Sequence, residues 1–593
     1  MKTNIFNGFK ERVLNLKFSR KGREEFSHVQ HIVKSFSSAE KITFRILLTI
    51  FIITAFALTV GNDNLATYRP DDGGTLTEGI IGTPRLINPL LAISDADRDL
   101  TALIYSGLTR INENGDPILD IAESYEISDD GLLYTFKIKE DAEFHDGEPI
   151  TADDIIFTVL KAQDPNIRSL KRADWEGVSL QKVDDRIVTF ELKQSYPGFL
   201  NNTSLGILPK HIWNEIPADS FSLNKFNTEP IGSGPYKISK IKKDRVDIPL
   251  SYTLKSFKDF TLGKPYISKV VFKFAKNEDE LIQMFNNGDI ETLNSISPAT
   301  ALELENNGSK TLRLPLPRIF GLFLNQSEAP VLADSSVRRA LETSIPKELL
   351  VDEIFFGFAD VAEGPIPSHL QPFESLGGTD EVVSPESQIT AAQLILENNE
   401  WEKNDEGIYV TEKNDEMIML SFSLSTNNVE ELVEVAEYVV DVWRKVGANV
   451  DLKIFEPGDL NQNVIRPRNF ETLLFGMVVG RDSDFYAFWH SSQRNDPGLN
   501  ISNYANIEID GILDDMREEL DEKKRKNNFI SLDKEIGADR PAIFLYTPQF
   551  IYIIPEKIEG IKIASIITAD NRFNNIHEWY IHTDRILNLW NKN

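Results

Sequence analysis

Residues 134–154 read YTFKIKEDAEFHDGEPITADD, and this stretch gives the strongest indication of the fold. Apolar and polar side chains alternate over residues 134–139, which predicts a half-buried strand. Asp146-Gly147 predicts a turn after that strand. Thr151 and Asp154 then stand in the spacing of a capping box and predict the start of a helix. Its expected apolar face consists of Ile155, Ile156, Val159 and Leu160.

Five further segments contain characteristic glycines, prolines and asparagines and follow in chain order. They are PIGSGPY (230–236), NQSEAPVLADSSVRRAL (325–341), GPIP (364–367), the run 391–401 ending in Glu400-Trp401, and NISNYANIEID (500–510). Together with the first stretch, they resemble the family 5 extracytoplasmic solute-binding proteins, which deliver peptides and related solutes to ABC importers. The resemblance runs from about Thr75 to the C terminus. It departs from the family at Glu400, where a glycine is usual.

The resemblance implies an α/β, two-lobed fold of the periplasmic-binding-protein type. This is the large peptide-binding form, which carries an extra subdomain. One lobe would consist of residues 75–268 and 548–593, and the other of residues 269–547. The solute would bind in the cleft between the lobes, a place that suits hinge closure.

One segment supports the α/β class from its own pattern. A strand is expected from Met417 through Leu424, followed by a helix from about Asn428 to Val446 with apolar residues on one face. Gly447 would end the helix, and residues 449–455 would form a second strand. A strand, a helix and a strand in this order imply a parallel sheet.

Length and composition limit the possible functions. The chain has 593 residues, more than one hydrophobic core accommodates, so two or three lobes are expected. Its 63 basic and 92 acidic residues give a net charge of −29, which argues against nucleic-acid binding because phosphates would be repelled. The charge serves solubility or, alternatively, attracts cationic solutes. The absence of cysteine excludes disulfides, thiolate metal sites and thiol nucleophiles.

The N-terminal part predicts a membrane anchor. Ile46–Val60 is apolar and follows a basic leader. Residues 1–41 are therefore expected to stay in the cytoplasm, and residues 42–60 to form one transmembrane helix that acts as a signal anchor. Residues 61–74 would be a linker to an extracytoplasmic body, at the cell surface or in the periplasm. A cleaved signal peptide is the alternative, because Ala55-Phe56-Ala57 has the form of a cleavage site.

Residues 473–490, LLFGMVVGRDSDFYAFWH, are the best candidate ligand segment, because an apolar strand opens into a loop with two carboxylates. In peptide-binding members of the family, this segment pairs with the backbone of the ligand, and an aspartate receives the α-ammonium. The resemblance assigns that role to Asp482 and the next acidic position to Asp484. A carboxylate facing an ammonium forms a charge-assisted hydrogen bond, whereas main-chain pairing is insensitive to side chains. Either aspartate could instead cap the loop.

Four further residues are candidate ligand contacts. Arg481 could meet a ligand carboxylate, and Tyr486 and Trp489 could line the cleft or pack in the core. The family often has a tryptophan just before the aspartate, where this chain has Val478-Val479. Ser94 matches a loop that supplies facing backbone in relatives.

Three residues of the glycine-rich segment are expected to support the hinge. They are Gly232, Gly234 and Tyr236. Glycine allows a tight backbone path there, and the tyrosine is expected to stabilise the hinge rather than touch the solute.

No catalytic pattern stands out among the residues. The chain has eight histidines, and it contains no phosphate-binding loop or nucleophile elbow in a convincing context. We expect neither an enzyme nor a cofactor or metal site. The sequence therefore predicts a membrane-anchored, monomeric receptor that passes an oligopeptide or similar solute to an ABC permease. The alternatives are a sensor or envelope interaction protein with the same fold, which would signal through the leader, and an extracytoplasmic hydrolase.

Overall fold

The computed structural model describes residues 36–60, 66–196, 198–367, 384–413, 415–479, 484–519, 521–564 and 566–587. Within its helices and strands, the side chains of residues 55–60, 66–68, 518, 522 and 585–587 are not described. The chain forms two compact units. One consists of Met1–Asp71 and Thr583–Asn593, and the other of Asp72–His582.

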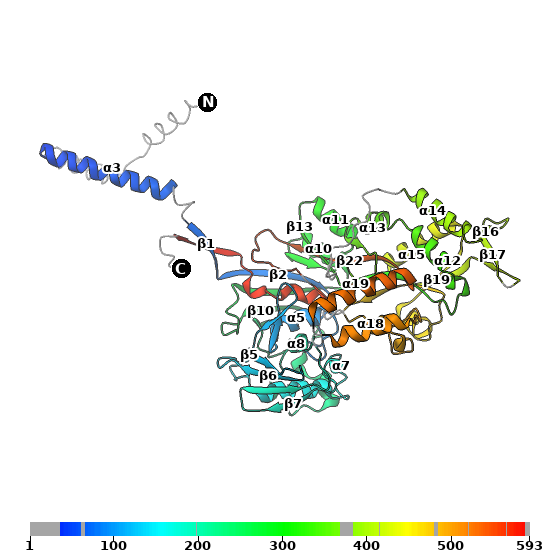
Figure 1. The fold of residues 1–593 in the computed structure, drawn as a ribbon. Helices are drawn as coiled ribbons and strands as arrows, with labels where there is room; N and C mark the ends of the chain where they lie inside the picture. Colours follow the sequence, from blue (N-terminus) through cyan, green and yellow to red (C-terminus); the bar gives the residue numbers. More distant parts are fainter. Residues whose placement is uncertain are drawn as a thin grey trace. The chain divides into compact units, whose positions relative to one another are not determined.

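The smaller unit contains one long helix and one strand pair. Helix α3 (Ser38–Val60) has 23 residues, and β1 (Ala66–Asp71) pairs with β23 (His582–Leu587), as Figure 1 shows. None of the helices in the described part of the chain is long and apolar enough to cross a membrane. The anchor predicted at residues 42–60 is thus not confirmed, and its last six side chains are not described. Residues 1–35 of the predicted leader lie outside the described residues.

Part of the predicted linker at residues 61–74 is a strand. Residues 66–71 form β1, and β2 (Gly73–Ile81) begins two residues later. The partner of β1 is a strand at the opposite end of the sequence. Local composition around Pro70 cannot reveal such a partner, because pairing depends on the neighbouring strand.

The larger unit is built on a mixed twelve-stranded sheet. Its path runs β20 (Asn449–Phe455), β19 (Ser421–Asn427), β21 (Thr472–Val478), β14 (Arg318–Leu324), β22 (Ala542–Ile554), β12 (Thr292–Asn294), β2, β11 (Ile267–Ala275), β10 (Pro249–Ser256) and β9 (Tyr236–Lys243). Two further strands, β13 (Lys310–Pro315) and β15 (Ala359–Val361), pair with β22 off this path.

Strand β22 is shared by two large hydrophobic cores. The terminal core consists of buried side chains from residues 76–272, 314–316 and 550–579. The central core consists of two adjoining clusters from residues 319–546. Residues at the start of β22 pair with β14, and those at its end pair with β13, so one continuous strand enters both cores.

The central core is covered by helices on the sheet. Residues of α12 (Ser335–Thr343), α13 (Lys347–Phe355), α14 (Pro385–Glu397) and α15 (Glu430–Val446) belong to one of its clusters. Residues of α18 (Ile507–Glu518) and α19 (Glu522–Asp539) belong to the other. A smaller cluster, to which α10 (Glu278–Asn286) and α11 (Pro298–Asn306) contribute, lies beside β12.

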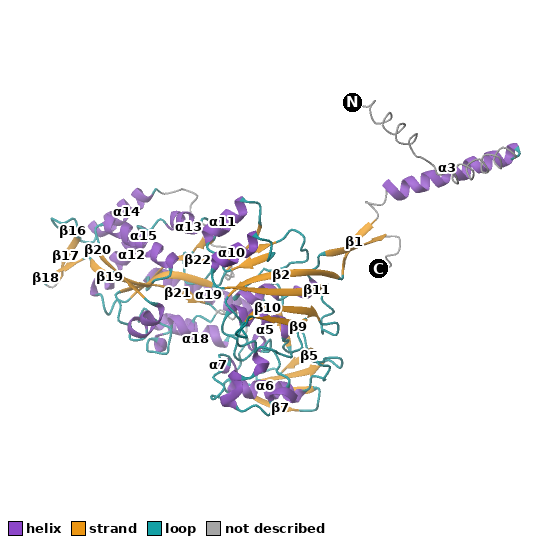
Figure 2. Ribbon diagram, turned by 180° about the vertical axis from the view of Figure 1, so that it is seen from behind, coloured by secondary structure: helices purple, strands orange, loops and turns teal. Residues whose placement is uncertain are grey.

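The diagnostic stretch forms the predicted elements. Strand β6 (Leu133–Ile138) lies in a four-stranded sheet with β5 (Ala122–Ile127), β8 (Ile187–Glu191) and β7 (Ser179–Lys182), set apart from the large sheet in Figure 2. Gly147 has φ +93°, and Thr151 and Asp154 form the capping box that starts α6 (Ala152–Gln163). The predicted face is wrong at Leu160, which is 54% exposed, whereas Phe157 is buried. Packing against neighbouring elements decides which face of a short helix is buried. Apolar periodicity alone therefore included Leu160 in the buried face and left out Phe157.

The predicted strand–helix–strand unit is confirmed. Strands β19 and β20 are parallel, with Ser421 opposite Asn449, and α15 connects them. Gly447 follows the helix with φ +121°, a conformation that favours glycine. The first strand is shorter than predicted, because residues 416–419 form a separate strand, β18, in a small sheet with β16 (Glu402–Lys403) and β17 (Tyr409–Lys413).

Candidate ligand-binding site

The turn before helix α5 (Asp95–Ile104) contains the predicted contact Ser94. This residue caps the helix: its Oγ donates to Asp97 Oδ2 at 2.7 Å and accepts from the Asp97 backbone N–H at 3.1 Å. The other Asp97 oxygen accepts from the backbone N–H groups of Arg85 and Leu86. The turn is thereby fixed from two sides, and Ile93 stands 58% exposed beside it.

The glycine-rich segment packs directly on the end of α5. A Cβ atom at Gly232 would lie 2.1 Å from the Ile104 carbonyl oxygen, and the Gly234 N–H donates to that same oxygen at 2.8 Å. Only glycine permits this approach. Tyr236 is fully buried and donates from its hydroxyl to the Ile267 carbonyl at 3.0 Å, so it supports the sheet and is shielded from solvent.

His145 joins the diagnostic stretch to this glycine-rich segment. Its Nε2 lies 3.0 Å from the Gly234 carbonyl oxygen, and its backbone N–H donates to Gly232 O at 2.8 Å. A carbonyl only accepts, so Nε2 carries the proton. Burial lowers the pKa of His145 to about 4, which keeps the ring neutral near pH 7.

Arg318 senses the charges at the start of α5, and sequence reasoning missed it. It is the first residue of β14 and stands opposite Val478 of β21. Burial lowers its pKa, Asp95 raises it and Arg98 lowers it, so the start of α5 lies close enough to act on the guanidinium. Its Nε is buried and has no hydrogen-bond partner among the residues that the structure describes. A charged residue opening the apolar strand RIFGLFL was the available signal.

The predicted ligand loop is described only after its first part. Asp482 and Arg481 lie outside the described residues. Asp484 accepts a hydrogen bond from the Tyr486 backbone N–H at 3.0 Å and pairs with Arg517 at 3.0 Å. These contacts are those of a carboxylate that organises its own loop.

The two predicted aromatic contacts differ in their surroundings. Tyr486 stacks on His490, with ring centroids 4.1 Å apart, and the Arg517 guanidinium lies 4.2 Å from its ring. Trp489 is only 1% exposed and packs near Phe323 in the central core. The structure thus places Trp489 in the core, while a role for Tyr486 in the cleft stays a prediction.

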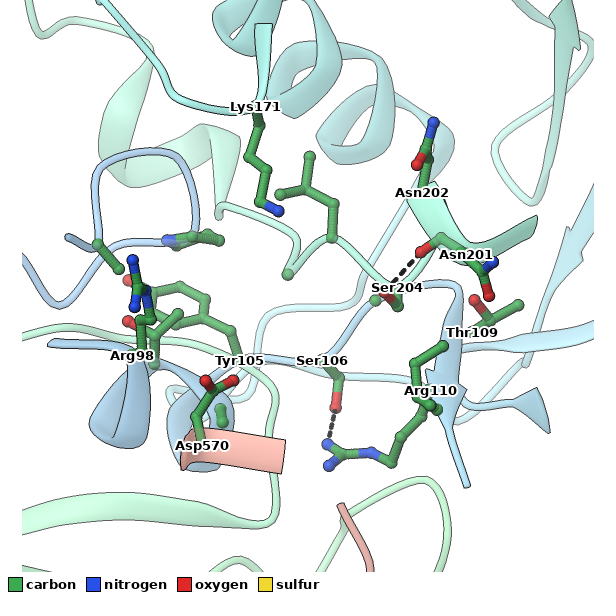
Figure 3. A pocket seen from close by; sticks show the side chains of 18 of the residues that line it. Arg98, Tyr105, Ser106, Thr109, Arg110, Lys171, Asn201, Asn202, Ser204 and Asp570 are labelled. Atoms are coloured by element: carbon green, nitrogen blue, oxygen red, sulfur yellow. Dashed lines mark hydrogen bonds between the residues drawn. The ribbon is translucent and has the colours of Figure 1, made fainter. Parts of the chain in front are cut away.

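A polar cavity of about 400 Å³ lies in the terminal core, and none of the described residues of the predicted ligand segment belongs to its lining. It is lined by parts of residues 89–92, 98–111, 170–175, 201–206 and 568–574, together with Asp120. Figure 3 shows the Lys171 and Asp570 side chains reaching toward it from opposite sides. Sequence reasoning missed this cavity, because its walls come from six separate parts of the chain.

A second cavity, of about 480 Å³, lies beside β21 in the central core. We call it the apolar cavity, because apolar side chains form much of its lining. They are Phe323, Leu460, Ile465, Phe475, Met477, Phe488, Leu499 and Ile501. Arg468 and Asp496 are among its polar lining residues. Among the described residues, no group of three or more His, Asp or Glu side chains is placed to hold a metal ion.

Comparison with known proteins agrees with this architecture. Residues 116–497 match the profile of the bacterial extracellular solute-binding proteins, family 5. The oligopeptide-binding protein AppA of Bacillus subtilis (strain 168) is 30% identical over 522 residues, which cover 86% of this chain and 92% of AppA.

Two solved structures are similar over nearly their whole length. AppA from Bacillus subtilis in complex with a nonapeptide has 30% identity and a TM-score of 0.64, covering 87% of this chain and 100% of that one. NikZ from Campylobacter jejuni in complex with Ni(L-His) has 25% identity and a TM-score of 0.65, covering 85% and 99%. The family profile spans more than half of the chain, so the resemblance seen in the sequence is confirmed. This protein belongs to family 5 of the bacterial extracellular solute-binding proteins.

Proposed function

We propose that this protein is a monomeric, extracytoplasmic receptor that captures peptides and delivers them to the permease of an ABC importer. The edge of β21 carries the proposal. Residues 472 and 473 pair with β19, whereas residues 474–478 pair with β14 alone among the described strands. An extended peptide can add to such an edge as a further strand through main-chain hydrogen bonds. The peptide-binding relative AppA supports this solute class.

The proposed cleft lies between the start of α5 and the adjoining ends of β14 and β21. In the proposal, Ser94 and Arg318 belong to its two walls. Arg318 pairs with Val478 at the end of β21, and Val478 is 50% exposed. In the proposal, Asp482 receives the α-ammonium of the peptide, a role carried over from the sequence. A charge-assisted hydrogen bond of this kind contributes roughly 1.5–3 kcal/mol.

Titration calorimetry on the full-length protein tests this role with pentaalanine and its N-acetylated form. Asp482→Asn is expected to weaken binding of the free peptide about tenfold or more, because its ammonium loses the facing charge. Binding of the acetylated peptide should change less than twofold. Asp484→Asn is the matched control. It removes the same charge at a position two residues away, and Arg517 already pairs with the Asp484 carboxylate.

The outcomes distinguish the role of Asp482 from the capture of peptides by the protein as a whole. Equal losses for both peptides would show that Asp482 shapes the loop. A selective loss in Asp484→Asn would move the ammonium site to Asp484. If the unmodified protein binds neither peptide, nor longer peptides of mixed sequence, peptide capture is overturned.

We also propose that residues 42–60 hold the protein at the membrane, with the body outside the cytoplasm. The basic leader and the apolar run of the sequence support this proposal. After an alkaline wash of isolated membranes, the protein should remain in the membrane pellet with an intact N terminus. A mature N terminus close to Ala57 would instead establish cleavage of a signal peptide.

A further inference from the structure

We infer that the polar cavity is a second subsite that binds a cationic group, an ammonium or a guanidinium, against Asp570. The inference rests on the proposed function in one respect: the cation is taken to be a lysine or arginine side chain of the captured peptide. The same chemistry is presented by a free diamine, and the experiment below distinguishes the two sources.

The cavity begins next to the proposed cleft. Ala92 and Arg98 belong to its lining, and between them lies the turn that contains Ser94. The inference places the entrance of the cavity at this turn, so that a side chain of the bound peptide enters beside Ser94. The volume of about 400 Å³ accommodates a long side chain and some water.

Unpartnered polar atoms mark the cavity as built for a guest. Four of its lining side chains have a buried oxygen without a hydrogen-bond partner in the described structure: Thr101 Oγ1, Tyr105 OH, Asn201 Oδ1 and Asp570 Oδ1. Tyr105 is only 3% exposed. A buried polar atom without a partner costs stability, so native structures keep few of them. All four atoms can accept hydrogen bonds, which an ammonium or guanidinium donates.

Charge selects a cation over a neutral donor. Each basic residue of the lining already pairs with a carboxylate: Arg98 with Asp95 at 3.4 Å, Arg110 with Asp120 at 2.9 Å and Lys171 with Asp174 at 3.6 Å. Asp570 pairs with no basic residue among those described; its other oxygen accepts only from Asn571 Nδ2, at 3.4 Å. An uncompensated carboxylate therefore remains once the pairs are formed.

The groups behind Asp570 add to the negative charge. Arg572 lies between Glu78 and Asp99, and all three side chains are fully buried. One guanidinium thus faces two carboxylates. Burial raises the pKa of Asp99 to about 7, Arg572 opposes this rise, and Asp570 and Glu78 add to it. A cation beside Asp570 would relieve this repulsion.

Calorimetry on the full-length protein tests the subsite with pentaalanine and its five single-lysine variants. Each variant is compared with the matching acetyl-lysine peptide, which keeps the shape and removes the charge. At one position or more, lysine should bind about tenfold tighter than acetyl-lysine, as expected for a charge-assisted hydrogen bond. Asp570→Asn should reduce this ratio to below twofold while pentaalanine affinity is unchanged. Asp441→Asn, on the exposed face of α15, controls for net charge.

Tyr105→Phe separates a binding role from a structural one. The Tyr105 hydroxyl has no hydrogen-bond partner among the described residues, so its removal should leave the free energy of unfolding unchanged or higher. The lysine preference should nevertheless fall several-fold. A clear loss of stability would show that the hydroxyl serves the fold, and an unchanged preference in both variants would overturn the subsite.

Cadaverine, a free diamine, separates the two sources of the cation. Binding of pentaalanine without any lysine preference overturns this inference and leaves peptide capture standing. Binding of cadaverine that depends on Asp570, without binding of any peptide, supports the cation site and overturns peptide capture. If neither cadaverine nor any peptide binds, both are overturned.

Discussion

The polar cavity and the apolar cavity are similar in volume but opposite in chemistry. Four lining side chains of the polar cavity have a buried oxygen without a partner, whereas none of the apolar cavity's described lining residues has one. A site with unpaired polar atoms rejects a guest that cannot pair them, while an apolar pocket discriminates weakly, by size and shape. One receptor could thus combine strict selection in the terminal core with tolerance in the central core.

The same contrast appears in the buried arginines of the two cores. In the terminal core, Arg572 binds two buried carboxylates. In the central core, Arg468 beside the apolar cavity donates to backbone carbonyls of Ile465, Arg494 and Gly498. In the terminal core, Arg572 is thus held by buried charges, whereas in the central core Arg468 is satisfied by neutral groups.

The largest expected change in stability follows from replacing Arg572. Arg572→Met should lower the free energy of unfolding by about 3–5 kcal/mol, because two carboxylates are left buried without their cation. Arg468→Met should cost about 1–3 kcal/mol, because only neutral carbonyls lose their donor. Urea unfolding of both variants measures the difference. Equal losses would mean that the ion network contributes no more than ordinary hydrogen bonds.

Acid should affect the terminal core first. Burial lowers the folded-state pKa of His145 to about 4 from 6.5, so between these values the folded protein binds fewer protons than the unfolded chain. The contribution of His145 to the free energy of unfolding therefore falls as pH drops from 6.5 to 4, by up to roughly 3 kcal/mol. Asp99 opposes this fall, because its raised pKa of about 7 lets the folded state take up a proton there before the unfolded chain does. His577, also in the terminal core, has its pKa lowered in the same direction as that of His145 by burial.

Hydrogen exchange at pH 7 and pH 4.5 measures this difference. Protection should fall in residues 76–272 before it falls in the central core, and His145→Gln should reduce the pH dependence. Gln can keep the hydrogen bond to Gly234 without taking up a proton. Simultaneous loss of protection in both cores would show that acid does not distinguish them.

Two glycines provide a comparison of intermediate size. Gly232→Ala places a Cβ against the Ile104 carbonyl oxygen of the backbone and should cost about 1–3 kcal/mol. At Gly476→Ala, the nearest atoms, at 2.8 Å, belong to the Phe320 ring, a side chain that can shift. The second loss should therefore be the smaller one, and thermal unfolding at equal protein concentration decides between them. A larger loss of stability in Gly476→Ala than in Gly232→Ala would show that the Phe320 ring cannot shift.

The smallest effect is expected at Asp484. Its carboxylate is one-third exposed, and its partner Arg517 is about half exposed. Asp484→Asn should change the free energy of unfolding by less than about 1 kcal/mol, because exposed ion pairs contribute little and the amide oxygen can still accept from Tyr486. A larger loss in chemical denaturation would mean that the loop depends on this charge.

The accuracy of the sequence predictions follows the range of the interactions. The capping box at Thr151, the turn at Gly147 and the unit around α15 were predicted correctly, because each is determined by residues a few positions apart. The exposure of Leu160 was missed, since a neighbouring layer selects the buried face of a helix. The strand at residues 66–71 was missed because its partner lies near residue 585.

The candidate site was less accessible to prediction than the fold. The family resemblance proposed a ligand segment at residues 473–490, and that assignment stays a prediction. Arg318 and the polar cavity depend on contacts between distant segments. Asp570 and Tyr105, for example, line the same cavity although 465 positions separate them. No local sequence pattern predicts that two such distant residues line one cavity. Whether a side chain is an unpaired acceptor depends on the packing around it in the folded protein.

The span of the ion network has a consequence for biosynthesis. Glu78 and Arg572 are 494 residues apart, so at about 5–20 residues per second roughly half a minute or more separates their synthesis. The central core consists of one continuous stretch and can form during this time. The terminal core cannot yet be completed, because the Glu78 and Asp99 carboxylates still lack the Arg572 guanidinium. A chain released before Arg572 is made would contain the whole central core but could not complete the terminal one. Completion of synthesis is thereby coupled to the assembly of the polar cavity.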